Sequence, residues 1–216
     1  MRIVRFRDDQ GLIRYGIDRG DGTAQLLARS PLEAPETLPE LTNQVVPIAQ
    51  RLAPLVPVNI FCIGLNYREH ARETGAAIPE QPILFMKPTT ALNDPEAAIC
   101  IPACCTHGEE VDYEGELAVV IGRPGRNIVP EDALNHVLGY TCANDVSARR
   151  WQRHAGGGQW IRGKGFDTFC PLGPVLVTAD EIPDPQNLAL TTTLNGQVMQ
   201  QGHTSDMIFS VAQLIA

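Results

Sequence analysis

The sequence predicts an α+β protein that is mostly β-structure. Glycine and proline are frequent, with 19 and 17 among 216 residues, and both favour turns between short elements over long helices. Short apolar runs rich in β-branched residues occur between these turns, for example at residues 58–64 and 117–121. Asn195-Gly196 separates two strand-like runs, which is a strong hairpin signal. These three observations favour many short strands.

The first 57 residues differ in pattern from the rest of the chain. A stretch rich in Pro and Leu runs from Pro31 to Pro57, and we expect an irregular connector there with one helix near residues 45–52. We therefore expect a small N-terminal domain with its linker over residues 1–57 and a second domain over residues 58–216. Short strands separated by Gly and Asp turns are expected at residues 3–7, 13–17 and 24–27.

The second part alternates short strands with short helices. A helix over residues 67–74 is expected to end at Gly75, because Gly adopts the left-handed conformation that closes helices. A second helix is expected from Pro130, since Pro is tolerated in the first helical turn. The apolar spacing at residues 207–215 indicates a third helix. Strands are expected at residues 58–64, 83–86, 114–121, 139–144, 191–194 and 197–199.

Composition excludes several classes of protein. Lys and Arg number 17 against 25 Asp and Glu, and the net charge of −8 argues against nucleic-acid binding. Residues 1–7 contain no apolar core long enough for a signal peptide. No run approaches the ~20 apolar residues of a transmembrane helix. We therefore expect a cytoplasmic protein with no membrane partner.

Two carboxylates, Glu114 and Glu116, share one face of a predicted strand, because successive strand side chains point to opposite faces. Like charges side by side repel each other, and burying them unpaired is costly. A hard divalent cation bound by carboxylate oxygens removes this conflict. Asp145 follows another predicted strand and is the natural third ligand, which favours Mg²⁺ or Mn²⁺ over Zn²⁺. A solvated strand face is the alternative for the pair alone.

His70 and Glu73 stand three residues apart on a predicted helix, so their side chains share a face. A His beside a carboxylate can act as an oriented general base. An ordinary pair on a surface helix has the same spacing and is the alternative. Gly64 and Gly75 on either side would let the segment move as a lid.

Lys164 lies in a Gly-rich turn after the loop at residues 156–158. A Lys in such a turn can approach an anionic substrate or a developing enolate. The same Gly pattern is weak evidence for phosphate binding, because the helix of a dinucleotide fingerprint is missing. Cys104, Cys105 and His107 are an alternative soft-metal or redox site without zinc-motif spacing. The six cysteines form no Cys-x-x-Cys pair, and we expect reduced thiols that are mostly buried.

Six motifs, taken in order along the chain, resemble those of the fumarylacetoacetate hydrolase family, and of its shorter acylpyruvase-like and 2-hydroxyhepta-2,4-diene-1,7-dioate isomerase-like members. Each motif alone is weak, but six in the same order are specific. The resemblance extends from Ile60 to Ala216. The motifs are Gly64-Leu65-Asn66-Tyr67-x-x-His70-x-x-Glu73, Phe85-Met86-Lys87-Pro88, Asp112-Tyr113-Glu114-Gly115-Glu116-Leu117, Asn144-Asp145-Val146-Ser147-Ala148-Arg149 with Gln152, Gly163-Lys164-Gly165-Phe166-Asp167 and Thr204-Ser205-Asp206-Met207-Ile208-Phe209.

The resemblance implies a mixed β-roll around a Mg²⁺ or Mn²⁺ site, usually in a homodimer, with a small N-terminal domain. It makes residues 58–216 the catalytic domain. The matching positions imply catalytic roles for His70, Glu73 and Lys164, substrate-binding roles for Lys87, Arg149 and Gln152, and metal-binding roles for Glu114, Glu116 and Asp145.

The implied activity is metal-dependent cleavage of a C–C bond in a β-diketo or acylpyruvate-type 2-oxo acid. Water activated by His70 would attack the distal carbonyl, and the metal with Lys164 would stabilise the departing enolate. An isomerase or decarboxylase of a 2-hydroxymuconate-type oxo acid in aromatic catabolism uses the same enolate chemistry and stays open. An inactive binding protein is the alternative of another class.

Two positions depart from the family pattern. Members of the family continue past the helix at Met207 into a Gly-Thr-Pro-x-Gly-Val-Gly type segment that this sequence does not contain. We therefore expect the chain to be a fragment of a longer protein. Gly165 stands where many relatives have Ser, which favours a local packing change or an altered substrate contact.

Overall fold

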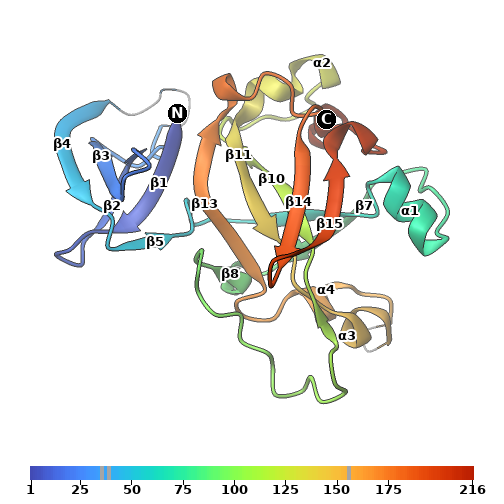
Figure 1. Cartoon of the computed structure of the whole chain (residues 1–216). Helices are drawn as coiled ribbons and strands as arrows, with labels where there is room; N and C mark the ends of the chain where they lie inside the picture. The colour runs from blue at the N-terminus through green and yellow to red at the C-terminus, as the bar shows by residue number, and fades with distance from the viewer. Residues whose placement is uncertain (35–36, 38–39, 155–156) are drawn as a thin grey trace.

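The computed structural model describes residues 1–34, 37, 40–154 and 157–216 (Figure 1). Positions 35–36 and 38–39 of the predicted connector and Gly156 of the predicted loop lie outside the described residues. The described residues form a mostly β protein, as the sequence predicts. The helices among them are all too short or too polar to span a bilayer.

Nine of the described strands form one sheet, which is antiparallel apart from one short pair. Seven strands follow one another in the order β10-β11-β13-β1-β2-β3-β4, while β5 pairs with β1 and β8 pairs in parallel with β13. The sheet therefore runs through both predicted domains. The strands are β1 (Arg2–Arg7), β2 (Ile13–Asp18), β3 (Thr23–Leu27), β4 (Leu41–Pro47), β5 (Gln50–Leu52), β8 (Leu92–Asn93), β10 (Gly115–Ile121), β11 (Val137–Asn144) and β13 (Cys170–Thr178).

The N-terminal strands β1 to β5 form a lobe at one side of the molecule, and β1 pairs with β13 of the larger part (Figure 1). Alternate residues of β1 face different packing clusters. Ile3 packs in a cluster with Leu176, whereas Val4 and Phe6 pack in another with Val175. The three strands predicted before residue 28 are confirmed within one residue at each end. The division at residue 57 stays a prediction.

The helix predicted near residues 45–52 is wrong, because this segment forms β4 and β5. Val45 and Val46 are β-branched and pair with β3, and Pro47 cannot donate the hydrogen bond that a helix interior needs. Pairing with distant strands therefore decides this segment, and the local apolar spacing is misleading.

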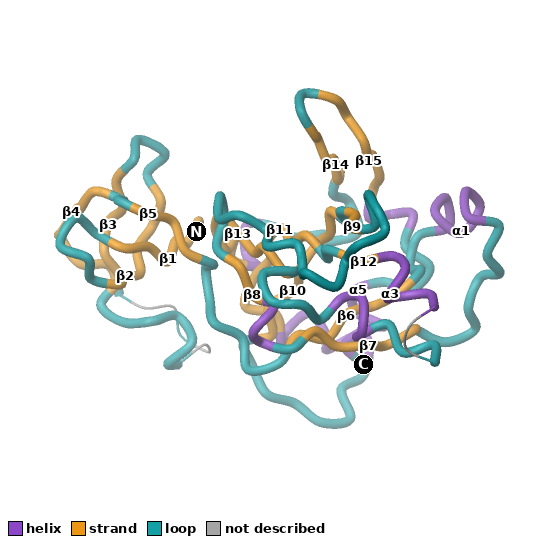
Figure 2. The backbone as a smooth tube through the Cα atoms, turned by 90° about the horizontal axis from the view of Figure 1, so that it is seen from below, coloured by secondary structure: helices purple, strands orange, loops and turns teal. Residues whose placement is uncertain are grey.

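Smaller two-stranded sheets complete the larger part. The predicted hairpin at Asn195-Gly196 is confirmed and joins β14 to β15, and it projects from the body in Figure 2. The helix α1 ends at Gly75 in the left-handed conformation, as predicted. The pairs are β6 (Ile60–Gly64) with β7 (Ile83–Lys87), β9 (Val111–Asp112) with β12 (Ser147–Ala148), and β14 (Ala189–Leu194) with β15 (Gln197–His203). The helices are α1 (Arg68–Thr74), α2 (Pro130–Ala133), α3 (Arg149–His154), α4 (Ile161–Lys164) and α5 (Val211–Ile215).

Further elements differ from expectation. The central strand β13 was not predicted, because it starts Cys-Pro-Leu-Gly-Pro, and Pro and Gly are unusual inside a central strand. The helices α3 and α4 were not predicted either. The helix expected over residues 207–215 is shorter, because Ser210 caps its first turn through a capping box with Gln213.

The expectation that the cysteines are mostly buried is wrong. All six are free thiols, but only Cys62 and Cys170 are buried, and Cys105 is half-buried. The other three lie in loops or on a sheet face turned towards solvent, where a small side chain is tolerated without a packing partner. The exposed cysteines are Cys100, Cys104 and Cys142.

Candidate metal centre and active site

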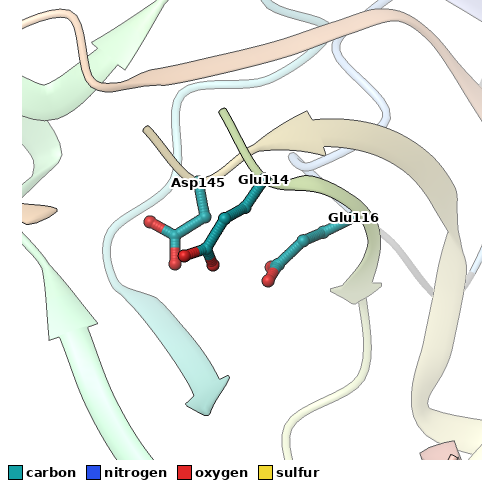
Figure 3. Close-up of side chains that lie close together, drawn as sticks. All are labelled: Glu114, Glu116 and Asp145. Atoms are coloured by element: carbon teal, nitrogen blue, oxygen red, sulfur yellow. The ribbon is translucent and has the colours of Figure 1, made fainter. Parts of the chain in front are cut away.

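The sheet brings together the three carboxylates predicted as metal ligands. Gly115 of β10 pairs with Asn144 of β11, so the start of one strand lies beside the end of the other. The Asp145 N–H donates to the Glu114 carbonyl oxygen at 2.8 Å. One carboxylate oxygen from each of Glu114, Glu116 and Asp145 lies within 4.8 Å of the others, and the side chains point into one space (Figure 3). This geometry suits one divalent cation.

Lys164, at the end of α4, lies beside two of these carboxylates and is buried. Its Nζ donates to Asp145 Oδ2 at 2.7 Å, to Glu114 Oε2 at 2.9 Å and to the Ser147 hydroxyl at 2.8 Å. Burial alone would lower the pKa of Lys164, but the charges of Glu114 and Asp145 raise it above its ordinary value. The Lys164 ammonium is therefore a fixed positive charge at the edge of the cluster of three carboxylates.

Arg149 begins α3 and is tied to the same group. Its guanidinium donates to Asp112 twice, at 2.9 and 2.7 Å, to Gln152 at 3.2 Å and to Glu114. A guanidinium carries five N–H donors, so these contacts leave one. The two residues predicted to bind substrate, Arg149 and Gln152, thus lie together at the carboxylate group, and Gln152 is buried.

Lys87, the third residue predicted to bind substrate, is enclosed in the interior with 1% of its surface exposed. Its Nζ donates to the carbonyl oxygens of Val146 at 3.0 Å, Phe169 at 2.9 Å and Lys164. It also lies 2.7 Å from Asp145 Oδ1, without hydrogen-bond geometry. Every short contact of this ammonium group is therefore with the protein itself.

Glu116 is the carboxylate with no positive neighbour in contact. No hydrogen bond reaches its carboxylate from the described part of the chain, and Asp145 Oδ1 is buried without a hydrogen bond. Burial, followed by the charges of Asp145 and Glu114, raises the pKa of Glu116 to about 8. For Glu114, burial opposes ionisation but Lys164 and Arg149 outweigh it and lower the pKa. All ligand atoms that Glu114, Glu116 and Asp145 offer are carboxylate oxygens, and some of these oxygens accept no hydrogen bond. Together with their negative charge, this makes them suited to a hard divalent cation.

His70 and Glu73 are not brought to the carboxylates. They lie on α1, which projects from the body in Figures 1 and 2, and both side chains are exposed. The base of α1 is held firmly, because the buried Asn66 side chain donates to the Phe209 carbonyl and accepts from the Phe209 N–H, both at 2.9 Å. The sequence places the pair correctly on a helix but gives no information on where that helix stands.

Gly64, predicted as a hinge, has a packing role. A Cβ atom at this position would lie 2.1 Å from the indole ring of Trp160. Trp160 in turn meets the Phe85 ring edge-on at 5.5 Å between centroids. Glycine is therefore required here for close approach of the ring.

Residues without a predicted role also contribute to the site. Ser147 is fully buried, and its hydroxyl lies 3.1 Å from Glu114 Oε1 and accepts from Lys164. Asp112 accepts from Arg149, and Tyr67 lies close enough to Glu116 that burial and this charge raise the pKa of the phenol to about 12. All three belong to the motifs quoted above, but motif membership carries no geometric information.

A pocket of about 440 Å³ lies beside the start of β10. Of the three carboxylate residues, only Glu116 lines it. Its walls come from strands β10, β11 and β13, from Pro95 and Glu96, and from residues 190–193 of the hairpin. By contrast, Cys104, Cys105 and His107 do not bring three metal-binding atoms together in the described part of the chain. The soft-metal alternative thus has no geometric support.

Comparison with known proteins gives a family match over most of the chain. Residues 59–216 match the family model described as fumarylacetoacetate (FAA) hydrolase C-terminal. The human protein named oxaloacetate tautomerase FAHD2A, mitochondrial, is 43% identical over 201 residues, which are 93% of this chain and 61% of the relative. The chain thus spans about three fifths of the length of such curated relatives.

Solved structures resemble the whole chain. A 2-hydroxyhepta-2,4-diene-1,7-dioate isomerase from Mycobacterium marinum matches with a TM-score of 0.83 and 37% identity, over 100% of this chain and 79% of that chain. A 5-carboxymethyl-2-hydroxymuconate delta-isomerase from Mycobacterium smegmatis matches with a TM-score of 0.85 and 38% identity, over 100% and 80%.

Proposed function

This chain belongs to the fumarylacetoacetate hydrolase family, and from that premise we propose that it is a divalent-metal-dependent enzyme acting on a 2-oxo acid. The observation that carries the proposal is the group of Glu114, Glu116 and Asp145, whose ligand atoms lie within 4.8 Å of one another. Lys164 beside this group supplies a fixed positive charge. The three carboxylates can therefore hold a cation, and the charge of Lys164 can stabilise the anion that forms when the substrate loses a proton.

Glu114, Glu116 and Asp145 would hold the metal, and Mg²⁺ or Mn²⁺ suits their oxygen atoms. The bound ion would supply Lewis-acid polarisation of the 2-oxo acid oxygens. Lys164 would stabilise the enolate through its charge, which the raised pKa preserves at neutral pH, while its three N–H donors stay on Glu114, Asp145 and Ser147. Arg149 would orient the substrate through its remaining N–H donor, and Gln152 would hold Arg149 in place.

We propose keto–enol tautomerisation or double-bond isomerisation of a small dicarboxylic oxo acid, such as oxaloacetate, as the reaction. This chemistry needs an enolate and a proton shuttle, and it needs no attacking water. The relatives named as a tautomerase and as isomerases support this choice. His70, oriented by Glu73, is the proposed proton acceptor, and α1 would have to approach the carboxylates for this transfer.

Hydrolysis of a C–C bond in an acylpyruvate-type acid is the second candidate, and decarboxylation would use the same enolate. The observation that favours hydrolysis is the His70–Glu73 pair on one exposed helix, where water is available for activation. Exposure equally suits an unreactive surface pair, so the reaction type depends on what α1 does when substrate binds.

The experiment is a product assay on the full-length protein with metal removed and restored. Oxaloacetate, an acylpyruvate and a 2-hydroxymuconate-type acid are incubated with Mg²⁺ or Mn²⁺, and the products are followed by NMR. Metal-dependent tautomer exchange without cleavage is expected. Two carboxylic acid products from the acylpyruvate would establish hydrolysis instead. A folded, metal-binding protein with no turnover would favour the binding-protein alternative.

Three further expectations are kept as proposals. We propose a homodimer, on the family resemblance alone. A cytoplasmic location stays a proposal, and the human and bovine relatives are named as mitochondrial. The division into an N-terminal domain over residues 1–57 and a catalytic domain over residues 58–216 agrees with the match beginning at residue 59.

A further inference from the structure

We propose that Lys87 is a positioning residue that fixes Asp145 and Lys164 from inside the protein, and that it does not bind substrate. This inference rests on the proposed function of the carboxylate group and revises the substrate-binding role that the sequence suggests. The observation behind it is the complete enclosure of the ammonium group by backbone carbonyls.

The hydrogen-bonding capacity of Lys87 is fully used. An ammonium group has three N–H donors and no acceptor. Three carbonyl oxygens accept from it, those of Val146, Lys164 and Phe169. All three donors are thus taken, so none remains for a substrate carboxylate, and only 1% of the residue's surface is exposed.

The three acceptors come from different segments that build the site. Val146 follows Asp145 directly, the Lys164 carbonyl belongs to the residue whose side chain crosses to the carboxylates, and Phe169 precedes β13. One side chain, entering from the end of β7, therefore joins the segment that follows Asp145 to the stretch between the end of α4 and the start of β13. Removing it would free both Asp145 and Lys164 to shift.

The charge of Lys87 has a second effect. Its Nζ lies 2.7 Å from Asp145 Oδ1, an oxygen that is buried without a hydrogen bond. At this distance the Lys87 ammonium stabilises the Asp145 carboxylate electrostatically, although none of its N–H groups points at Oδ1. Lys87 therefore holds the Asp145 carboxylate in place, while Oδ1 stays without a hydrogen bond.

Arg149, in contrast to Lys87, has the exposure and the free donor expected of a residue that contacts substrate. Its side chain is 28% exposed and has one N–H without an acceptor in the described residues. A buried group that holds ligands in place acts on metal affinity, whereas an exposed group acts on the Michaelis constant. Arg149 also donates to the ligand Glu114, so its loss should raise KM and weaken Mn²⁺ binding, whereas loss of Lys87 should weaken Mn²⁺ binding with KM nearly unchanged.

The test uses Lys87→Met, which keeps the length of the side chain and removes its donors and charge. Mn²⁺ binding is measured by calorimetry without substrate, thermal unfolding is measured on the metal-free protein, and kcat and KM are measured at saturating Mn²⁺. We expect Mn²⁺ affinity to fall about 10- to 100-fold and Tm to fall, with KM within about twofold of wild type. Arg51→Met, which removes the ion pair with Asp18 in the N-terminal lobe, is the control for loss of a structural cation.

Unchanged Mn²⁺ affinity and Tm, together with a raised KM, would overturn the proposal and restore the substrate-binding role. If Lys87→Met does not fold, Lys87→Gln keeps two N–H donors without the charge, and the same weakened Mn²⁺ affinity is expected of it. A wild-type protein that binds no Mn²⁺ would refute the proposed function. The Tm comparison with Arg51→Met would then still decide whether Lys87 is a structural tether.

Discussion

The proposed chemistry depends on two parts of the molecule, the cluster of three carboxylates that would bind the metal and helix α1, which carries the proton-transfer pair. These two parts differ in how firmly the protein holds them. Glu114 and Asp145 are fixed by Lys164, Arg149 and backbone hydrogen bonds. His70 and Glu73 are exposed on a helix whose side-chain hydrogen bonds to the body, among the described residues, lie at its base and first turn. The cation site is therefore preformed, whereas the proton-transfer pair is not. Binding of metal and transfer of protons should accordingly be separable by mutation.

The largest effect is expected from a substitution in the cation site. Asp145→Asn removes a carboxylate and leaves Lys87 and Lys164 without their shared partner. We expect Mn²⁺ affinity to fall more than about 100-fold and turnover to fall to background, because one of three charged ligands is lost. Calorimetry and the tautomer assay measure the two losses. Asp18→Asn, in the N-terminal lobe, is the control, and equal losses in both variants would mean general unfolding.

Helix α1 is tested by His70→Gln, which keeps a polar side chain on an exposed position. We expect kcat to fall about 10²- to 10⁴-fold, the usual contribution of a general base. Mn²⁺ affinity should be unchanged, since His70 makes no contact with the carboxylates. Steady-state kinetics and calorimetry together check this. A parallel loss of Mn²⁺ affinity would show that α1 belongs to the cation site and would break the comparison.

The anchor at the base of α1 is tested by Asn66→Ala. This change removes two hydrogen bonds between the base of α1 and Phe209 at a buried position. We expect a loss of about 1–3 kcal/mol in the free energy of unfolding, because the Phe209 backbone groups lose their partner. Urea unfolding measures it, with Asn43→Ala on an exposed strand as control. A loss no larger than that of the control would show that the anchor is not stabilising.

The smallest expected effect is the release of a proton from Glu116 when a metal ion binds. Its pKa is raised to about 8 in the metal-free protein, so it is largely protonated at pH 7, and a cation must displace that proton. Mn²⁺ affinity should rise about tenfold per pH unit between pH 6 and pH 8. By the same linkage, the metal-free fold loses stability as the pH rises from 4.5 through about 8. Calorimetry in buffers of different ionisation enthalpy should detect nearly one released proton, and Glu116→Gln should abolish it.

The sequence predicted the carboxylate group well for a local reason. Glu114 and Glu116 flank the first residue of β10 and Asp145 directly follows β11, so the pairing of these two strands was enough to bring them together. The position of α1 depends instead on contacts with residues 206–209, which are more than 130 positions away. No local pattern encodes such a contact.

The same distinction explains the other differences. Residues 45–52 have an apolar spacing that suits a helix, but pairing with β3 and β1 makes them strands. The family motif implies a substrate-binding role for Lys87, yet its three acceptors are backbone carbonyls at position 146 and within residues 164–169. Sequence patterns fix which face or element carries a residue, and tertiary packing decides whether that residue meets solvent.

Titration of the metal-stripped wild-type protein with Mn²⁺, with and without oxalate as a mimic of a 2-oxo acid, tests the preformed cation site most directly. One Mn²⁺ per chain should bind without oxalate, and oxalate should tighten that binding, because it can chelate the ion and face Lys164. Both effects should disappear in Glu116→Gln. No Mn²⁺ binding by the folded protein, or binding that Glu116→Gln leaves intact, would contradict a metal site at these carboxylates.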